Sequence, residues 1–133
     1  MRATLSPLQV KAFFFEKLKL EENPRGTVKH NLDIDFNVIE DESGTPGIQL
    51  FVKYNTKAKN PIIRLDVEAI SLFEIEKSLP EMQRKKLLFI NGLVITYGLV
   101  RGVVYQMCSV IPPSQRLLPS IDFTPLLKEK AKG

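Results

Sequence analysis

The residues with the clearest chemical potential are three pairs of carboxylates, each spaced two positions apart. The pairs are Asp33 with Asp35, Asp66 with Glu68, and Glu74 with Glu76. On a β-strand this spacing projects both side chains of a pair to one face. Such a pair can perform acid–base catalysis when burial raises the pKa of one member. The faces in question are otherwise polar, so we interpret these acids as solvated strand surface.

Metal and nucleophile chemistry would use histidine or cysteine, and the chain has one of each. Cys108 lies in an apolar helical pattern, which is typical of an inert core thiol. His30 lies on the apolar side of an alternating segment, and we expect it to be partly buried and hydrogen-bonded. One residue of each type cannot build a usual zinc site. The acids at 40–42 lack the alternating oxygen ligands of an EF-hand loop.

The glycines complete this survey of possible active-site motifs. Gly92, Gly98 and Gly102 lie inside a helical pattern and do not have the spacing of a dinucleotide-binding loop. The sequence also has no nucleophile elbow. We therefore expect no catalytic residue, no metal and no cofactor, and a protein that is not an enzyme.

The composition is that of one globular domain, with 133 residues, of which 44% are hydrophobic and 26% charged. No long apolar stretch follows the first residues, so we expect no signal peptide. Together with the lone cysteine, this predicts a reducing, cytoplasmic location.

The positive charge is concentrated in the second part of the chain. The formal net charge is +4, and residues 81–133 hold 8 basic and 3 acidic side chains. The basic residues cluster at 84–86 and at Lys128, Lys130 and Lys132. Such clusters can contact nucleic acid or an anionic membrane. The alternative is that they form the solvated start of one helix and a solvated tail.

Residues 1–76 show the alternation typical of β-strands. The expected strands cover 8–20, 28–38, 48–54 and 62–75. In the first strand the even positions are apolar and form the predicted core face, which leaves Phe13 and Phe15 on the opposite face. In the last strand the apolar parity changes, which predicts a bulge near Ser71.

After residue 76 the apolar period changes from two to 3.6, which predicts a long helix over 78–111. Ser78 and Glu81 have the spacing of a capping box, and a break is possible near Gly92. A short final helix is expected over 122–131, with Pro125 near its start. The fold class is therefore α+β: a four-stranded antiparallel sheet packed on one long helix and a short C-terminal helix, within a single domain.

The long helix has more apolar surface than a single sheet can cover. Its polar and glycine positions fall on a narrow stripe, whereas covering one sheet needs an apolar arc of only about 100° or somewhat more. The uncovered part must contact a second subunit, a membrane or a client protein. Arg101 would be costly inside a bilayer, so we expect no stable membrane insertion. The expected oligomer interface comprises Tyr97, Gly98, Arg101, Gly102 and Tyr105.

Three stretches resemble the SecB family of export chaperones. Residues 63–75 look like the family's last strand, and residues 97–101 look like part of its main helix, with Gly98 in place of a proline. Residues 118–127 are similar to its closing Leu-Pro segment and final helix. The resemblance extends over nearly the whole chain, although its motifs are short.

The resemblance implies a SecB-like fold, a dimer of dimers, and ATP-independent holding of unfolded polypeptides in hydrophobic grooves. It also implies docking to the motor protein SecA. This chain, however, is basic and has no Cys/His zinc tail, which weakens that expectation. A SecB-like chaperone that protects the antitoxin of a toxin–antitoxin module is the other variant.

For client contact we expect apolar residues that the strand and loop patterns leave in surplus. They are Phe13, Phe15, Phe51, Ile70, Leu72 and Leu117. Two other function classes stay open at this point: a nucleic-acid-binding module and an assembly component without clients. The nucleic-acid alternative is less favoured, because no strand combines basic residues with interleaved aromatics for base stacking.

Overall fold

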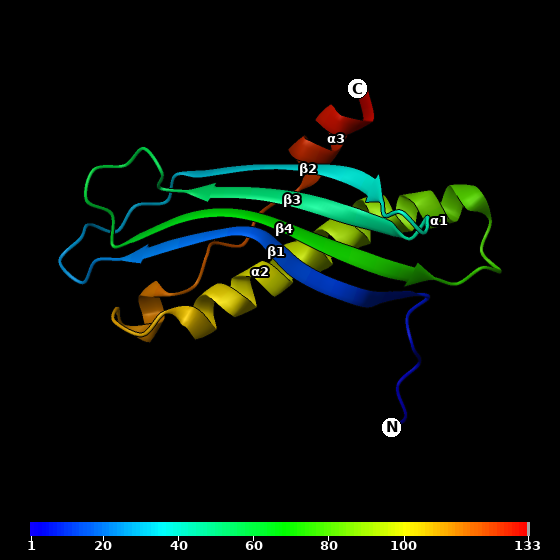
Figure 1. The fold of residues 1–133 in the computed structure, drawn as a ribbon, viewed down its shortest axis with the longest axis horizontal. Coiled ribbons are helices and arrows are strands. Elements are labelled where there is room, and N and C mark those ends of the chain that lie inside the picture. The colour runs from blue at the N-terminus through cyan, green and yellow to red at the C-terminus, as the bar shows by residue number, and fades with distance from the viewer. Residues whose placement is uncertain (133) are drawn as a thin grey trace.

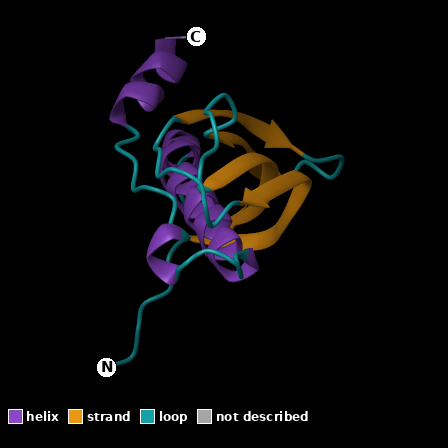
Figure 2. Ribbon diagram, turned by 90° about the vertical axis from the view of Figure 1, so that its left-hand side faces the viewer, coloured by secondary structure: helices purple, strands orange, loops and turns teal. Residues whose placement is uncertain are grey.

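The computed structural model describes residues 1–132, which form a sheet with a long helix across one face (Figures 1 and 2). The strands are β1 (Leu8–Glu22), β2 (Leu32–Glu40), β3 (Pro46–Tyr54) and β4 (Ile63–Ile75), in the order β1-β4-β3-β2. All neighbouring strands are antiparallel. β1 therefore pairs with the last strand, and β1 and β2 form the two edges. The predicted fold class is confirmed.

The long helix runs without interruption along the inner face of the sheet. It comprises α1 (Glu81–Leu87), a π-helical turn η1 (Leu88–Gly92) and α2 (Leu93–Met107). The irregularity predicted near Gly92 is this π turn, at whose end the Thr96 hydroxyl donates to the Gly92 carbonyl at 2.7 Å. A Cβ at Gly92 would lie 3.2 Å from Cγ1 of Ile48, so glycine lets the helix approach β3 closely.

The ends of this helix differ from the prediction. It begins at Glu81 after Pro80, and the Ser78 hydroxyl donates to the Glu76 carboxylate instead of capping the helix. It ends at Met107, because Cys108 has an extended backbone. The predicted capping box and the predicted end at residue 111 are therefore wrong.

The segment before β2 is a pinned loop and not part of a strand. The buried Asn55 side chain accepts from the Asn31 amide at 2.9 Å and donates to the Lys29 carbonyl at 2.9 Å. Because the backbone N–H of Asn31 and the C=O of Lys29 are bonded to this side chain, they do not pair with a neighbouring strand. His30 is exposed, although its Nδ1 shares a 2.6 Å hydrogen bond with the Tyr54 hydroxyl. The hydrogen bond was predicted correctly, but the partial burial and the strand over 28–31 were not.

The core lies between the inner face of the sheet and one stripe of the helix. Odd positions of β4 and even positions of β3 face inward, where they meet a helical stripe spaced three and four residues apart. The fully buried members include Leu50, Val52, Leu65, Val67, Phe73, Leu93, Val100 and Val104. The alternation of β3 and the helical spacing of the stripe are what the sequence pattern predicted, whereas the parity change predicted for the last strand is wrong.

β1 carries two bulges that the alternation of its residues does not reveal. Its pairing with β4 shifts between Val10 and Ala12, and again between Phe15 and Lys17. Between the two shifts the parity is reversed, so Phe13 and Phe15 face inward and Phe14 faces outward. The prediction that even positions form the core face throughout is therefore wrong for this stretch.

β4, by contrast, keeps one parity along its whole length. Ser71 is buried on the inner face, in register with Ile48 of β3, and no shift occurs in the pairing of these two strands. The prediction of a bulge near Ser71 in this strand is therefore wrong, and the nearest register shift lies on β1, between Val10 and Ala12. As a result, Ile70 and Leu72 face outward without breaking the strand.

The chain ends in a helix that stands beside the sheet. After a short 3-10 turn, η2 (Pro113–Gln115), an extended segment leads to α3 (Thr124–Lys132). Figures 1 and 2 show α3 beyond the β2 edge and set apart from the two packed layers. Its start is stabilised by Asp122, whose carboxylate accepts from the Thr124 amide at 3.0 Å.

Candidate functional site

Two of the carboxylate pairs considered first line open hollows. Glu74 and Glu76 line one of about 810 Å³ together with Lys77 and Arg84, and Asp33 and Asp35 line one of about 430 Å³. Asp33 and Asp35 are exposed on the outer face of the sheet, and Asp66 forms an ion pair with Lys17 at 2.7 Å. Among residues 1–132 no three His, Cys, Asp or Glu side chains are arranged to hold a metal ion. None of the six paired carboxylates is buried, so we take the exposed apolar surfaces as the candidate site.

The six residues expected to contact clients lie in three different places. Phe13 and Phe15 are partly buried on the inner face, where their rings meet edge to face at 5.1 Å and pack against the core. Phe51, Ile70 and Leu72 share the outer face of the sheet. Leu117, which is 56% exposed, lies in the loop after α2.

An outer apolar patch, formed by Phe14, Ile39, Phe51, Ile70 and Leu72, crosses all four strands. Phe14 is in register with Ile70, and Leu72 is in register with Gly47, which faces Ile39. At Gly47 a Cβ would lie 2.9 Å from Cδ2 of Leu72, so the glycine lets Leu72 lie over β3. Phe14 is 44% exposed, whereas Ile70 is 8% exposed. Phe14 is thus the most accessible aromatic ring of the patch.

Sequence reasoning missed Phe14, because its even position placed it with the core. The only local signal was the run Phe13-Phe14-Phe15, in which at least one ring must face away from the core on any strand. The two bulges of β1 decide which of the three rings faces outward, and these bulges arise from the pairing of β1 with β4.

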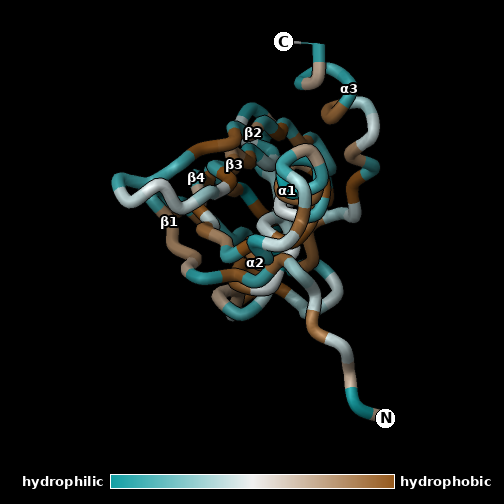
Figure 3. Tube along the Cα trace, turned by 90° about the vertical axis from the view of Figure 1, so that its right-hand side faces the viewer, coloured by the Kyte–Doolittle hydropathy of each residue, from teal (hydrophilic) through white to brown (hydrophobic). Residues whose placement is uncertain are grey.

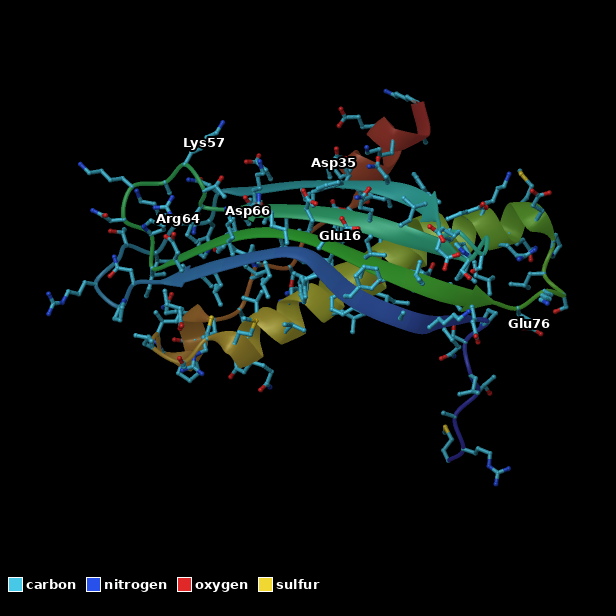
Figure 4. The ribbon with its side chains drawn as sticks, viewed as in Figure 1. Glu16, Asp35, Lys57, Arg64, Asp66 and Glu76 are labelled. Atoms are coloured by element: carbon cyan, nitrogen blue, oxygen red, sulfur yellow. The ribbon has the colours of Figure 1, made fainter. Side chains whose placement is uncertain are left out.

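The remaining outer face is charged and tied together by side-chain bonds. Lys17 pairs with Asp66, and Arg64 pairs with Glu21 at 3.3 Å. The Arg64 guanidinium also donates to the carbonyls of Asn55, Thr56 and Ala58. Figure 4 shows Arg64 and Asp66 toward one end of the sheet and Asp35 beside α3. Carboxylates also border the apolar patch, because Phe51 is in register with Asp35 of β2 and with Glu68 of β4.

A further hollow, the β2–α3 groove, lies between the β2 edge and the C-terminal helix. It has a volume of about 700 Å³ and is lined by Phe36, Phe89, Leu126 and Lys130, among others. The rings of Phe36 and Phe89 are 5.4 Å apart. The Lys130 ammonium lies 2.7 Å from Oδ1 of Asp35, and its hydrogen bond is the main cause that lowers the pKa of this carboxyl. The groove thus combines aromatic walls with one charged pair.

The outer side of α2 is also free. Gly98 and Gly102 are exposed, and a Cβ at either would meet no atom of the described residues within 4 Å. They line a shallow hollow together with Arg101, Tyr105 and Leu117. Val94 on the same helix is 50% exposed. This matches the expected apolar surplus of the helix within one protomer.

Two residues of the expected oligomer interface contact their own chain. Tyr97 is 3% exposed, and its hydroxyl donates to the Pro119 carbonyl at 2.7 Å; burial raises its pKa to about 12. Arg101 donates through Nε to the Leu118 carbonyl at 3.0 Å. Tyr97 is therefore a core residue with almost no surface for a partner. An interface through Gly98, Arg101, Gly102 and Tyr105 stays a prediction.

By length and composition the helix from Glu81 to Met107 could cross a membrane. Its most apolar 18-residue window has a mean hydropathy of 1.8, and 39% of that window is buried. Figure 3 shows the hydrophobic residues of α2 beside those of the strands, whereas α3 mixes both kinds. Packing on the sheet accounts for part of the apolar character of the long helix.

Part of the basic charge of the second half is neutralised within the chain. In α1, Lys85 pairs with Glu81 at 3.4 Å, and in α3 Lys130 pairs with Asp35. The rest of the two basic clusters lies on two different helices. This arrangement does not add support for a nucleic-acid interface.

Comparison of the fold with solved structures finds a SecB-like protein. The chain is similar to the SecB-like chaperone Rv1957 of Mycobacterium tuberculosis, solved in complex with a ChAD peptide from the antitoxin HigA1 (Rv1956). The likeness has a TM-score of 0.54, covers 86% of this chain and 90% of the other, and has 16% sequence identity. Neither protein-family models nor curated protein sequences give a match. The architecture of this chain is therefore SecB-like.

Proposed function

We propose that this chain, whose fold is SecB-like, is a chaperone that holds non-native polypeptide segments without ATP. The observation that carries the proposal is its fold likeness to a chaperone whose solved complex contains an antitoxin peptide. The apolar surfaces described above support it, because holding an unfolded segment requires exposed apolar area.

The outer apolar patch and the β2–α3 groove are the proposed contact surfaces. Burial of apolar surface contributes about 25 cal/mol per Å², so a few client side chains of about 150 Å² each would contribute several kcal/mol before entropy costs. Aromatic rings such as Phe14 and Phe89 accept many side chains, which suits a binder of varied sequences. No nucleotide is required for such binding.

We further propose that the protein is a homo-oligomer, with a dimer of dimers as the expected assembly. The free side of α2, with its two open glycine positions, is the surface that would bring a second helix close. For the partner we propose an antitoxin or another non-native protein of the cytoplasm. Docking to SecA is the weaker expectation, because the chain is basic, with a formal net charge of +4.

The proposed function is tested by suppression of aggregation. A chemically denatured enzyme is diluted into buffer with increasing amounts of the protein, with and without ATP, and light scattering is recorded. We expect suppression near equimolar ratios that ATP does not change. An inert protein of similar size and charge is the control. If the protein suppressed aggregation at none of the ratios, the proposal would be wrong, and an assembly component without clients would describe this protein better.

A further inference from the structure

The two loops at one end of the sheet carry positive charge and no negative charge. They are the β1–β2 connection, residues 23–31, and the β3–β4 connection, residues 55–61. Their basic residues are Arg25, Lys29, Lys57 and Lys59, and neither loop holds an aspartate or glutamate. Their formal charge of +4 equals the net charge of the whole chain, so the charges of all other residues sum to zero. We call these two loops the cationic end of the sheet.

The acidic residues next to the cationic end have other partners. Glu21 pairs with Arg64, and Glu22 accepts from the amides of residues 109–111. Asp33 is in register with Lys53 across β2 and β3. Within residues 1–132 none of the four basic side chains of the cationic end forms an ion pair. Their charge is therefore available to a partner.

The backbone of the cationic end is fixed by contacts between the two loops. The Thr27 amide donates to the Asn60 carbonyl at 2.8 Å. A Cβ at Gly26 would lie 2.5 Å from the carbonyl oxygen of Pro61, so the close approach of the loops requires glycine. The Arg64 guanidinium holds the second loop through its three carbonyl acceptors. A fixed backbone loses little conformational entropy when the loops bind a partner.

The basic side chains of the cationic end lie at the surface. Arg25, Lys57 and Lys59 are exposed, and Lys29 is half-buried. Figure 1 shows the two loops at the end of the sheet opposite α1, and Figure 4 shows Lys57 at this end. Val28, which precedes Lys29, is 48% exposed. A partner can therefore contact several positive charges and one apolar side chain together.

Among anionic partners, an acidic polypeptide segment fits this surface better than a nucleic acid. Neither loop contains Phe, Tyr or Trp, on which the bases of a single strand would stack. Contacts with only four phosphates would also give weak binding of nucleic acid at physiological salt. Aspartate and glutamate side chains, by contrast, pair with lysine and arginine one at a time, and an aliphatic neighbour can pack on Val28.

We propose that the cationic end is a further contact surface for polypeptides and binds an acidic segment of a client. This inference rests on the proposed function and adds a client chemistry to it. Apolar segments of the client contact the apolar surfaces described above, and an acidic segment of the same client contacts these loops. Electrostatic attraction also speeds the encounter with acidic chains. The protein therefore prefers acidic clients to basic clients of equal apolar content.

The test measures the affinity of the full chain for two fluorescent peptides. The peptides share one apolar core and differ at three flanking positions, which are either glutamate or glutamine. Lys57→Glu combined with Lys59→Glu reverses the charge of the second loop. The matched control combines Lys77→Glu with Lys86→Glu, because both lysines are exposed, form no ion pair within residues 1–132 and lie outside the cationic end. The two double variants have the same net charge, so a difference between them reports the position of the charge.

We expect the wild type to bind the glutamate peptide about five- to ten-fold more tightly than the glutamine peptide at about 50 mM salt, the scale of two or three exposed ion pairs. At about 500 mM salt this preference should fall below about two-fold, because salt screens exposed charges. The Lys57→Glu and Lys59→Glu double variant should lose the preference, whereas the control double variant should keep most of it.

Equal affinities of the wild type for the two peptides at low salt would overturn the inference. An equal loss of preference in both double variants would also overturn it, because the effect would then come from net charge. A single-stranded oligonucleotide is the third probe. If it bound more tightly than the glutamate peptide at physiological salt, and only the Lys57→Glu and Lys59→Glu double variant lost this binding, the surface would serve a nucleic acid instead.

Suppression of aggregation would survive each of these three results, so the proposed function would stand without the inference. If the wild type bound neither peptide and did not hold a denatured enzyme, the proposed function would be wrong, and the inference that rests on it would be wrong as well.

Discussion

At the residue scale, the three consecutive phenylalanines of β1 have different roles. Phe13 and Phe15 pack inward, and Phe14 is the exposed ring of the outer apolar patch. Replacement of Phe13 and Phe15 is thus no test of client binding, because it damages the core. The informative change on this strand is at Phe14.

We expect Phe14→Ser to weaken suppression of aggregation about three-fold while changing the free energy of unfolding by less than about 1 kcal/mol. Phe13→Ser should instead lower the free energy of unfolding by about 2 kcal/mol, because it leaves a void beside the core. Urea denaturation and the scattering assay measure the two effects. Val28→Ser, which removes an exposed apolar side chain outside the patch, is the control. Equal suppression by Phe14→Ser and the wild type would exclude the patch from the site.

Glu22 links the end of β1 to the chain that leaves α2. Its Oε1 accepts from the amides of Ser109 and Val110 at 2.9 Å and of Ile111 at 3.3 Å. Desolvation would raise the pKa of Glu22, but these three hydrogen bonds, with Arg116 nearby, outweigh it and leave the pKa lowered. A lowered folded-state pKa stabilises the fold above the unfolded-state pKa, and this stability is lost as the pH falls through the folded-state value.

Glu22→Gln should therefore lower the free energy of unfolding by about 1 kcal/mol at pH 7, since a neutral amide accepts these bonds less strongly. The difference from the wild type should shrink as the pH falls below the ordinary glutamate pKa of about 4.3 and through the lowered folded-state pKa of Glu22. Urea denaturation at pH 7 and pH 3.5 measures it. Glu21→Gln is the control, because it removes only an exposed ion pair, and it should lower the free energy of unfolding by less than about 0.5 kcal/mol. A difference independent of pH would show that the charge of Glu22 is not what matters.

At the element scale, the π turn and Gly92 set how closely the long helix lies on the sheet. Gly92 faces Ile48 and Phe73, whereas Gly102 on α2 faces open space in the described chain. We therefore expect substitution by alanine to change the free energy of unfolding in opposite directions at Gly92 and Gly102. Packing within the protomer requires a glycine at position 92 but not at position 102.

We expect Gly92→Ala to destabilise the fold by about 1–2 kcal/mol, because the added methyl crowds Ile48. Gly102→Ala should stabilise the protomer by about 0.5–1 kcal/mol through helix propensity. Thermal and urea denaturation of both variants measure these changes, each acting as the control of the other. A stabilised Gly92→Ala variant would mean that the helix lies farther from β3 than described.

At the scale of the whole molecule, the free side of α2 predicts assembly. Light scattering should return a multiple of the 15.1 kDa protomer mass. Gly102→Leu should lower that mass, because a bulky side chain separates two closely packed helices. Ala131→Leu, which adds the same side chain to an exposed position of α3, should leave the mass unchanged. A mass near that of one protomer at micromolar concentration would contradict the proposed oligomer.

The sequence by itself determined the kind and order of the elements. Alternation at 48–54 and 63–69 and helical spacing from Leu93 to Val104 indicate burial on one side of each element, because the type of each residue reflects its own burial. The surplus of apolar surface on the long helix could also be predicted from the sequence, because the helical spacing of its residues shows which sides of the helix are apolar.

Only the tertiary structure decided how the elements combine. The pairing of β1 with β4, the two bulges that turn Phe14 outward, and the side chain of Asn55 that keeps residues 29–31 out of β2 all depend on partners distant in the sequence. The place of α3 beside the β2 edge likewise involves distant partners, among them Lys130 with Asp35 and the apolar contacts of Leu126 and Leu127. The local periodicity of the sequence does not predict these partners, because strand pairing and packing between distant segments determine them.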